Sequence, residues 1–332
     1  MNFRSVLAVI IVFFPAFAAQ AGQVLKIATL APDGTSWMQE MRAAGKEIAK
    51  RTNNRVTLKF YPGGIMGNEA SVLRKMRIGQ LQGSALTNTT LGQIAPEAMI
   101  YSMPLKFRSY EESNFVRKKM DKVLLAGLKR EGYTVYQLAG DGFAYLYSQE
   151  PVNTLAQLQQ QKVWIPKDDT ISRVLLEELG ISPISLPLTD VLTGLQTGLF
   201  TTVGSPPAFT IALQWHTKVK YMVDLPMFFN FGALAFSNKS LEKISNADQA
   251  VMQEVLVAVF DRMSKANWEN NLKAREALQK QGIIILTPSE QERKKLLQLA
   301  DKVTRRLIKE GVFKENMVKE VESLLTAYRK SK

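Results

Sequence analysis

The side chains that most often carry out catalysis are scarce in this sequence. It contains no cysteine and a single histidine, His216. A cysteine nucleophile, a thiolate metal site and a histidine-rich metal site are therefore excluded, and a histidine-based triad is disfavoured. The acidic pairs Asp168-Asp169 and Glu177-Glu178 are adjacent in sequence, so their side chains point apart in a strand or a helix. The sequence thus predicts a protein that is not an enzyme, with no catalytic residue, metal site or cofactor.

A glycine-rich segment at residues 63–68 (GGIMGN) separates an expected strand from an expected helix. Free backbone N–H groups in such a segment could surround a phosphate. The segment lacks the Gly-Lys-Ser/Thr ending of a P-loop and the glycine spacing of a dinucleotide-binding motif. We therefore interpret it as a structural turn.

The chain is basic, with 43 Lys or Arg against 30 Asp or Glu and a net charge of +13 over 332 residues. Such a balance suits an acidic partner, an anionic surface or nucleic acid. Apolar residues make up 46% and charged residues 22%, which excludes a disordered chain and a multi-span membrane protein. From residue 290 onward, 12 basic residues are interleaved with 7 acidic ones, a pattern that favours a solvated helical face.

The N-terminus has the pattern of an export signal. Arg4 precedes an apolar run at residues 6–14, and small residues follow up to Ala21. The run is shorter than the roughly 20 apolar residues that a membrane-spanning helix requires, although an N-terminal anchor is the alternative. We expect residues 1–21 to be a signal peptide cleaved after Ala21, and the mature protein to be periplasmic. Export disfavours nucleic acid as the partner.

The mature chain is predicted to form two α/β lobes, because short strands and helices alternate twice. The first series comprises strands at 24–29, 56–61 and 82–87, with a helix capped by Thr35 or Ser36 and a second helix at 68–78. The second series comprises strands at 163–166, 182–186 and 200–203, with helices at 170–179 and 189–196. Such alternation predicts a mainly parallel sheet in each lobe.

A long helix is predicted to brace both lobes. Residues 246–281 lack proline and glycine and carry an apolar stripe, and a helix of this length would extend about 54 Å. Together these features predict lobe 1 at 22–145 with part of 235–282, lobe 2 at 146–234, a straddling helix at 246–282 and a C-terminal helical segment at 283–332.

The sequence resembles the solute-binding proteins of tripartite ATP-independent periplasmic (TRAP) transporters, the DctP-type family. The motifs that carry the resemblance span nearly all of the mature chain in order: LKIAT at 25–29, the loop at 32–37, the run at 51–56, YPGG at 61–64, PLKFR at 104–108, YEE at 110–112 and LQTG at 195–198. The resemblance implies a two-lobed periplasmic binding protein fold that closes on a ligand. It also implies delivery of that ligand to integral membrane subunits of an ion-gradient-driven transporter.

The sequence departs from the family pattern where the resemblance places the ligand. The family's usual Lys-Ile-Arg-Val-Pro, whose arginine grips a carboxylate, corresponds to residues 162–166, with Trp164 at the arginine's place. A second frequent arginine corresponds to Ala144, and the usual Val-Asp-Gly-Gln-Glu-Asn-Pro has become FTTVGSP at 200–206. The bidentate guanidinium is the strongest carboxylate-specific group available to a pocket. We therefore expect a ligand other than a standard small dicarboxylate, although Lys162 or Lys167 could still supply a positive charge.

The candidate ligand-binding residues fall in segments that the family uses to line its cleft. Trp164 could stack on a ligand or pack in the core, and the other aromatic candidates leave the same choice open. The full set is Trp164, Ala144, Phe143, Tyr145, Gln82, Asn88, Thr201, Ser205, Phe209 and Phe229. A transport-independent carrier or envelope-interaction protein on the same fold is the alternative function, and an enzyme is the least favoured one.

Overall fold

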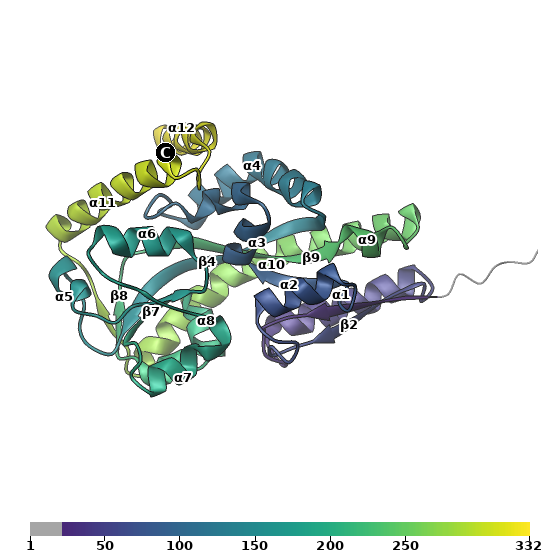
Figure 1. Cartoon of the computed structure of the whole chain (residues 1–332), viewed down its shortest axis with the longest axis horizontal. Coiled ribbons are helices and arrows are strands. Elements are labelled where there is room, and N and C mark those ends of the chain that lie inside the picture. The colour runs from purple at the N-terminus through teal and green to yellow at the C-terminus, as the bar shows by residue number, and fades with distance from the viewer. Residues whose placement is uncertain (1–21) are drawn as a thin grey trace, which may run out of the picture.

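The computed structural model describes residues 22–332, so the expected signal peptide lies outside the described residues. It shows two α/β lobes side by side, with the first at the right of Figure 1 and the second at the left. The predicted fold class is confirmed. Within the described residues, no helix combines the length and apolar character needed to cross a membrane. Nor does any cluster of three or more His, Cys, Asp or Glu side chains in this part of the chain suit a metal ion.

The first lobe is built on three parallel strands joined by two helices. The strands are β1 (Gln23–Ala28), β2 (Val56–Tyr61) and β3 (Gly83–Thr87), and the helices are α1 (Ser36–Arg51) and α2 (Glu69–Arg77). Thr35 caps α1 by accepting the Met38 N–H, and Asn68 caps α2 by accepting the Ser71 N–H. The three glycines of the glycine-rich segment, Gly63, Gly64 and Gly67, all have positive φ. The segment therefore forms a turn in which residues with a side chain would be strained.

Two long antiparallel strands connect the lobes. They are β4 (Tyr133–Ser148) and β9 (Phe228–Ser237), and β9 also pairs antiparallel with β3. β4 pairs with β9 as far as Ala144, and from Tyr145 onward it pairs with β7 (Thr202–Ser205). The expectation of a mainly parallel sheet was therefore incomplete, because strands that leave one lobe and return to it must run in opposite directions.

The second lobe contains short strands and short helices. The strands are β5 (Trp164–Pro166), β6 (Ile184–Leu186), β8 (Tyr221–Val223) and β10 (Ile284–Leu286). The helices are α5 (Leu155–Gln159), α6 (Thr170–Glu178), α7 (Val191–Gln196) and α8 (Pro207–Ala212), with 3₁₀ turns η2 (Leu188–Asp190) and η3 (Trp215–Lys218).

The first lobe contains further helices after β3. They are α3 (Asn88–Ile94), the 3₁₀ helix η1 (Pro96–Ser102) and α4 (Tyr110–Arg130), and the short helix α9 (Asn238–Leu241) follows β9.

Helix α10 (Asn246–Lys280) runs across both lobes, as Figure 1 shows. It packs against α1 of the first lobe, α8 of the second and the connecting strand β4. Asn271 makes the polar link: its Nδ2 donates to the Asp141 carbonyl at 2.7 Å, and its Oδ1 accepts the Ala208 N–H at 3.0 Å. Helix α10 thus fixes the position of β4 relative to the start of α8.

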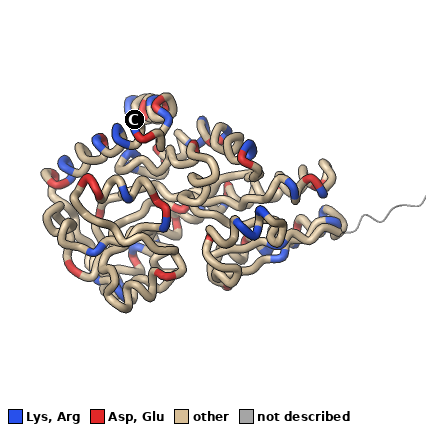
Figure 2. Tube along the Cα trace, in the orientation of Figure 1, with Lys and Arg blue, Asp and Glu red and all other residues tan. Residues whose placement is uncertain are grey.

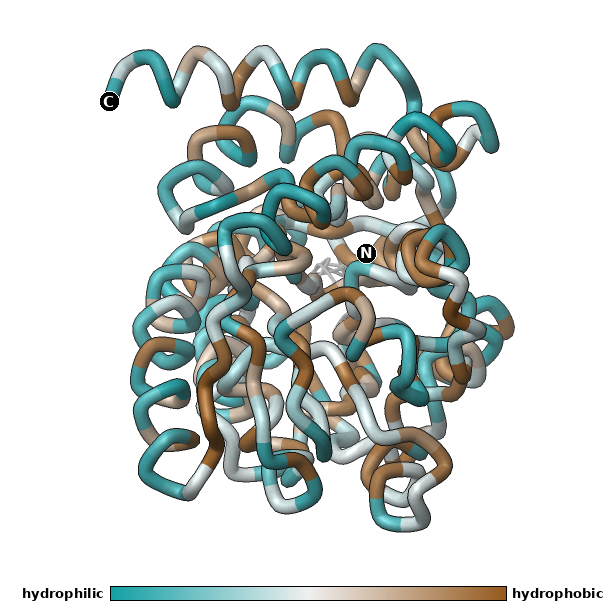
Figure 3. The backbone as a smooth tube through the Cα atoms, turned by 90° about the vertical axis from the view of Figure 1, so that its left-hand side faces the viewer, coloured by the Kyte–Doolittle hydropathy of each residue, from teal (hydrophilic) through white to brown (hydrophobic). Residues whose placement is uncertain are grey.

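The C-terminal segment forms two helices, α11 (Glu290–Lys309) and α12 (Glu315–Lys330), separated at Gly311 where φ is 74°. α11 packs on α6 and α12 packs on α4. Figure 2 shows basic and acidic residues interspersed along α11, and Figure 3 shows the hydrophobic residues of α12 mainly on the side that faces the protein. Some of these charges also attach α11 to α6, since Arg306 donates to Glu177 at 2.7 Å and to Glu178 at 3.0 Å.

Arg329 is expected to be the most stabilising charged residue of α12. Its Nε and Nη2 donate to the two carboxylate oxygens of Glu112 at 2.7 and 2.9 Å, and Glu112 is 6% exposed. Arg329→Ala leaves that carboxylate buried without its cation, and we expect it to lower the free energy of unfolding by about 1–3 kcal/mol in urea titrations. Lys330→Ala, at the exposed neighbouring position, is the control and should change stability little. An equal loss for both variants would contradict this assignment.

Candidate functional site

A cavity lies where the two lobes meet the connecting strands. The first lobe contributes Asn88 and Thr89 of α3 and Ser102 of η1, and the second contributes β5, α6 and Gly204 of β7. Residues of β4 and β9 lie between them. The cavity has a volume of about 110 Å³, which is room for several water molecules at the roughly 10–15 Å³ that each requires.

The lining of this cavity is mostly apolar and contains no Lys, Arg or His. The apolar side chains come mainly from the second lobe. They are Leu146, Leu158, Val163, Ile165, Pro166, Ile171, Leu175, Leu176, Leu179, Met227, Phe228 and Leu296, together with Ala144 and Trp164. Ligand pockets generally combine such a lining with a few polar groups that fix orientation.

The polar groups of the cavity include two carboxamides. Asn88 donates from Nδ2 to Ser102 Oγ at 3.0 Å, so its carbonyl oxygen remains available. Asn230 of β9 makes no side-chain hydrogen bond to another described residue. Tyr145 adds a phenol beside Arg275, whose guanidinium carbon is 5.9 Å from the ring centroid. Arg275 itself is held by both oxygens of Asp224 at 2.7 Å, so it is not a free cation for this cavity.

Asp169 is the single charged residue in the lining. Burial raises the pKa of its carboxyl group, and hydrogen bonds from Ser172 oppose that rise. Oδ1 accepts the Ser172 N–H at 3.1 Å and Oδ2 accepts the Ser172 hydroxyl at 2.7 Å, which makes Asp169 the N-cap of α6. The carboxyl group therefore holds the helix and also makes the cavity unfavourable for an anion.

Trp164 lines the cavity and is also packed into the second lobe. Trp164 is 3% exposed, and its Nε1 donates to the Leu186 carbonyl at 3.1 Å. The ring centroid lies 5.5 Å from that of Trp215 in an edge-to-face arrangement and 6.4 Å from that of Phe200. The indole N–H is thus already satisfied within the protein.

The other predicted ligand residues divide into two groups. Ala144, Tyr145 and Asn88 line the cavity together with Trp164. Phe143 and Phe229 pack against each other in the core of the first lobe, with ring centroids 5.6 Å apart. They do not line the cavity, and neither do Gln82, Thr201, Ser205 and Phe209.

The polar members of that second group have partners elsewhere. Gln82 accepts the Lys26 N–H and donates to the Gly79 carbonyl. Thr201 donates to Gln161, and Ser205 is buried against Thr210. Lys162 and Lys167 are exposed and do not line the cavity, so they supply no positive charge to its lining.

Asp141 is a half-buried residue at the lobe junction that sequence reasoning missed. It lies at an irregularity in the pairing of β4 with β9, and Asn267 Nδ2 donates to its Oδ1 at 3.1 Å. A Cβ at Gly232 would lie 3.1 Å from its Oδ2, so glycine at that position makes room for the carboxyl group. Burial raises the pKa of Asp141 to about 7, with the nearby charge of Arg117 opposing the rise.

The two lobes lie close together at Gly64 and Thr189. A Cβ at Gly64, in the loop after β2, would lie 3.4 Å from Leu30 and 3.5 Å from Thr189 Cγ2 of η2. Gly64 belongs to the first lobe and Thr189 to the second. The two lobes therefore approach each other closely at this point.

The comparisons with known proteins agree with this architecture. Residues 27–310 match the family of bacterial extracellular solute-binding proteins, family 7 (DctP). A solute-binding protein of Roseobacter denitrificans is 24% identical over 246 residues, covering 73% of this chain and 74% of the relative.

Two solved structures share the fold at low sequence identity. A TRAP periplasmic solute-binding protein from Desulfovibrio salexigens with bound orotic acid has a TM-score of 0.84 and 20% identity, covering 92% of this chain and 99% of that one. The sugar acid binding protein of Advenella mimigardefordensis in complex with galactonate has a TM-score of 0.86 and 15% identity, with the same coverage.

Proposed function

This chain belongs to family 7 of the bacterial extracellular solute-binding proteins, the DctP family, and we propose that it captures a small organic molecule without a carboxylate between its two lobes. The family assignment makes it a TRAP-type solute-binding protein. The nature of the ligand rests on the chemistry of the cavity.

The absence of any basic side chain from the cavity lining carries this proposal. A carboxylate removed from water must be compensated by a cation or by several hydrogen-bond donors, and otherwise costs several kcal/mol. In this cavity it would face the Asp169 carboxyl group instead. The aliphatic lining, with Asn88 and Asn230 as polar anchors, suits a ligand with an apolar body and one or two neutral hydrogen-bonding groups.

The structures with orotic acid and galactonate hold organic acids. The ligand that we propose here differs from both in charge. Trp164 and Ala144 stand where the family usually has arginines, and in this chain neither position offers a charged donor. The substitutions thus agree with the lining in disfavouring an acid.

We also propose where and how the protein works. Residues 1–21 would direct export and be removed, and the mature chain from Gly22 onward would act in the periplasm without catalysing a reaction. It would deliver its ligand to the integral membrane subunits of a TRAP-type transporter. Opening would bend β4 and β9 near the switch of β4 pairing at Ala144 and Tyr145, with residues 22–145 and 146–234 as the two lobes.

The ligand class can be tested by native mass spectrometry of the mature chain purified from a bacterial periplasm. A released neutral molecule of defined mass would support the proposal. Thermal-shift titrations with galactonate should leave the melting temperature unchanged, since stabilisation follows ligand affinity. A clear upward shift with galactonate would overturn the proposed ligand class.

Gly204→Phe is expected to block the cavity without unfolding the protein. Gly204 lines the cavity on β7, and a Cβ placed on it would meet no atom within 4 Å. The phenyl ring should then occupy the space of the ligand and weaken binding of the co-purified molecule by at least about tenfold, or 1.4 kcal/mol. Gly204→Ala is the matched control and should bind nearly as the wild type does. Undiminished binding by the Phe variant would show that the ligand lies elsewhere.

A further inference from the structure

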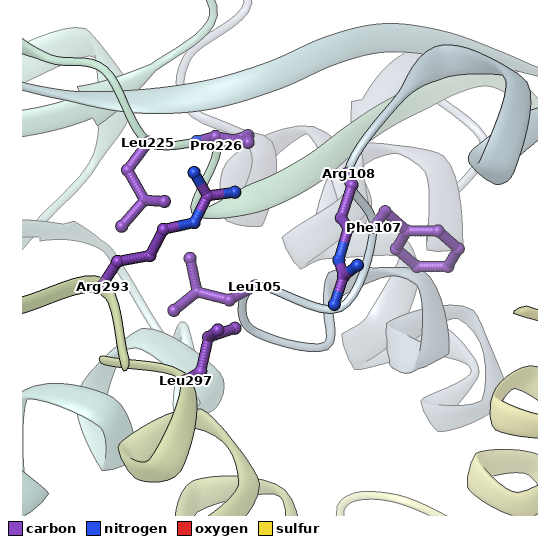
Figure 4. Close-up of a pocket in the computed structure, with 7 residues that line it drawn as sticks. All are labelled: Leu105, Phe107, Arg108, Leu225, Pro226, Arg293 and Leu297. Atoms are coloured by element: carbon purple, nitrogen blue, oxygen red, sulfur yellow. The ribbon is translucent and has the colours of Figure 1, made fainter. Parts of the chain in front are cut away.

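A second pocket, separate from the cavity between the lobes, has the opposite charge character. It is lined by Leu105, Phe107, Arg108, Leu225, Pro226, Arg293 and Leu297 and has a volume of about 170 Å³. Three segments far apart in sequence form it: the loop between η1 and α4, the link between β8 and β9, and the N-terminal half of α11. Figure 4 shows Arg108 on one side of the pocket and Arg293 on the other, with the Arg293 guanidinium group directed toward Pro226 and with Leu105 and Leu297 nearer to Arg293.

Neither guanidinium group of this pocket has an ion-pair partner among the described residues. Each lies near a carboxylate that another arginine already holds. Glu112, near Arg108, is bound by Arg329 through both oxygens, and Asp224, near Arg293, is bound by Arg275 through both oxygens. The guanidinium groups of Arg108 and Arg293 therefore lie beside the apolar side chains of the pocket without an ion-pair partner of their own among the described residues.

The pocket floor is held in place by an unusual backbone conformation. Leu105 has a φ of 54°, which is disfavoured for a residue with a branched side chain. Its N–H donates to the Met227 carbonyl at 2.8 Å, and its side chain is 7% exposed in the apolar cluster of the second lobe. The loop is thus anchored to the start of β9, so the position of Arg108 relative to α11 is defined.

We propose that this pocket binds a small organic carboxylate with an apolar body, such as an aliphatic or aromatic monocarboxylate. The carboxylate lies between Arg108 and Arg293 and accepts charge-assisted hydrogen bonds from both. The apolar body covers Leu105, Leu225 and Leu297 and is removed from water. The bound carboxylate would thus connect the loop after η1 with helix α11.

The test is isothermal titration calorimetry with sodium hexanoate and sodium benzoate on the mature protein. We expect dissociation constants on the order of 1 mM at low ionic strength, as befits ligands of this size. Hexanol, benzyl alcohol and inorganic phosphate should bind far more weakly, because each lacks either the charge or the apolar body. Salt should weaken hexanoate binding, since both guanidinium groups are exposed.

Matched variants locate the binding. Arg108→Gln and Arg293→Gln should each weaken hexanoate binding by about tenfold, the value of one charge-assisted hydrogen bond. Arg305→Gln, at an exposed position of α11 outside the pocket, removes the same charge and should have little effect. The Gly204→Phe variant should still bind hexanoate, which separates this site from the cavity between the lobes. Absence of hexanoate and benzoate binding, or equal binding by the Arg108, Arg293 and Arg305 variants, would overturn the proposal.

Discussion

Trp164→Ala is expected to lower the free energy of unfolding by about 3–5 kcal/mol, the usual cost of truncating a buried tryptophan. Trp164 is 3% exposed and contacts Trp215 and Phe200, which are 1% and 0% exposed. The substitution removes this aromatic packing and one of the two hydrogen bonds to the Leu186 carbonyl, which keeps the one from the Lys167 N–H. Guanidinium unfolding followed by circular dichroism measures the loss.

Trp164→Phe separates packing from hydrogen bonding at the same position. Phenylalanine retains an aromatic ring against Trp215 but cannot donate to Leu186, so we expect a smaller loss of about 1–2 kcal/mol. The pair also decides between the two roles that sequence leaves open for Trp164. If Trp164→Ala unfolds like the wild type but no longer binds the co-purified ligand, the ring stacks on the ligand and the core assignment is wrong.

Asp141 is expected to make the protein less stable as the pH rises from 5 to 8. Its pKa is raised from the ordinary 3.8 to about 7 by burial, so the folded state binds the proton more tightly than the unfolded state does. The stability that this preference contributes is fully present below about pH 4 and is lost as the pH rises through about 7. At about 1.4 kcal/mol per pH unit, we expect the loss to reach about 2–4 kcal/mol by pH 8.

Asp141→Asn should abolish this dependence, because an amide can still accept the hydrogen bond from Asn267 and carries no charge. Urea unfolding of both proteins at pH 5, 6, 7 and 8 gives the two slopes. Their difference isolates Asp141 from the other carboxyl groups whose pKa values burial raises, which are Glu69, Asp121 and Asp169. Asp168→Asn, at an exposed position, is the control. Parallel slopes for the wild type and Asp141→Asn would rule out this role for Asp141.

The candidate site was only partly predictable from the sequence. Trp164, Ala144, Tyr145 and Asn88 all line the cavity, and their segments were recognisable from the order of the family motifs. Phe143 and Phe229 were indistinguishable from them in sequence, because aromatic residues on a strand serve a core and a cleft equally well. Asn230 escaped notice because an isolated asparagine on a strand carries no local signal, and its place in the cavity depends on how β9 crosses between the lobes.

The two-lobed fold follows from local patterns that a single chain contains. Each of these patterns acts within a few residues, so it can be recognised along the sequence. They are the helical spacing of apolar residues, caps such as Thr35 and Asn68, and closing glycines such as Gly79 and Gly198. The long helix α10 can be predicted for the same reason, since its 35 residues include no proline or glycine.

Tertiary structure decided the features that depend on residues distant in sequence. The buried state of Trp164 requires Trp215, the raised pKa of Asp141 requires the space left by Gly232, and the pocket between Arg108 and Arg293 requires α11 to pack beside the loop after η1. Burial and charge pairing are properties of the neighbours that folding brings together, and neither has a signature at the residue itself. The sequence therefore determined the family and the architecture, whereas only the folded chain showed which side chains line the cavity between the lobes and which guanidinium groups among the described residues have no ion-pair partner.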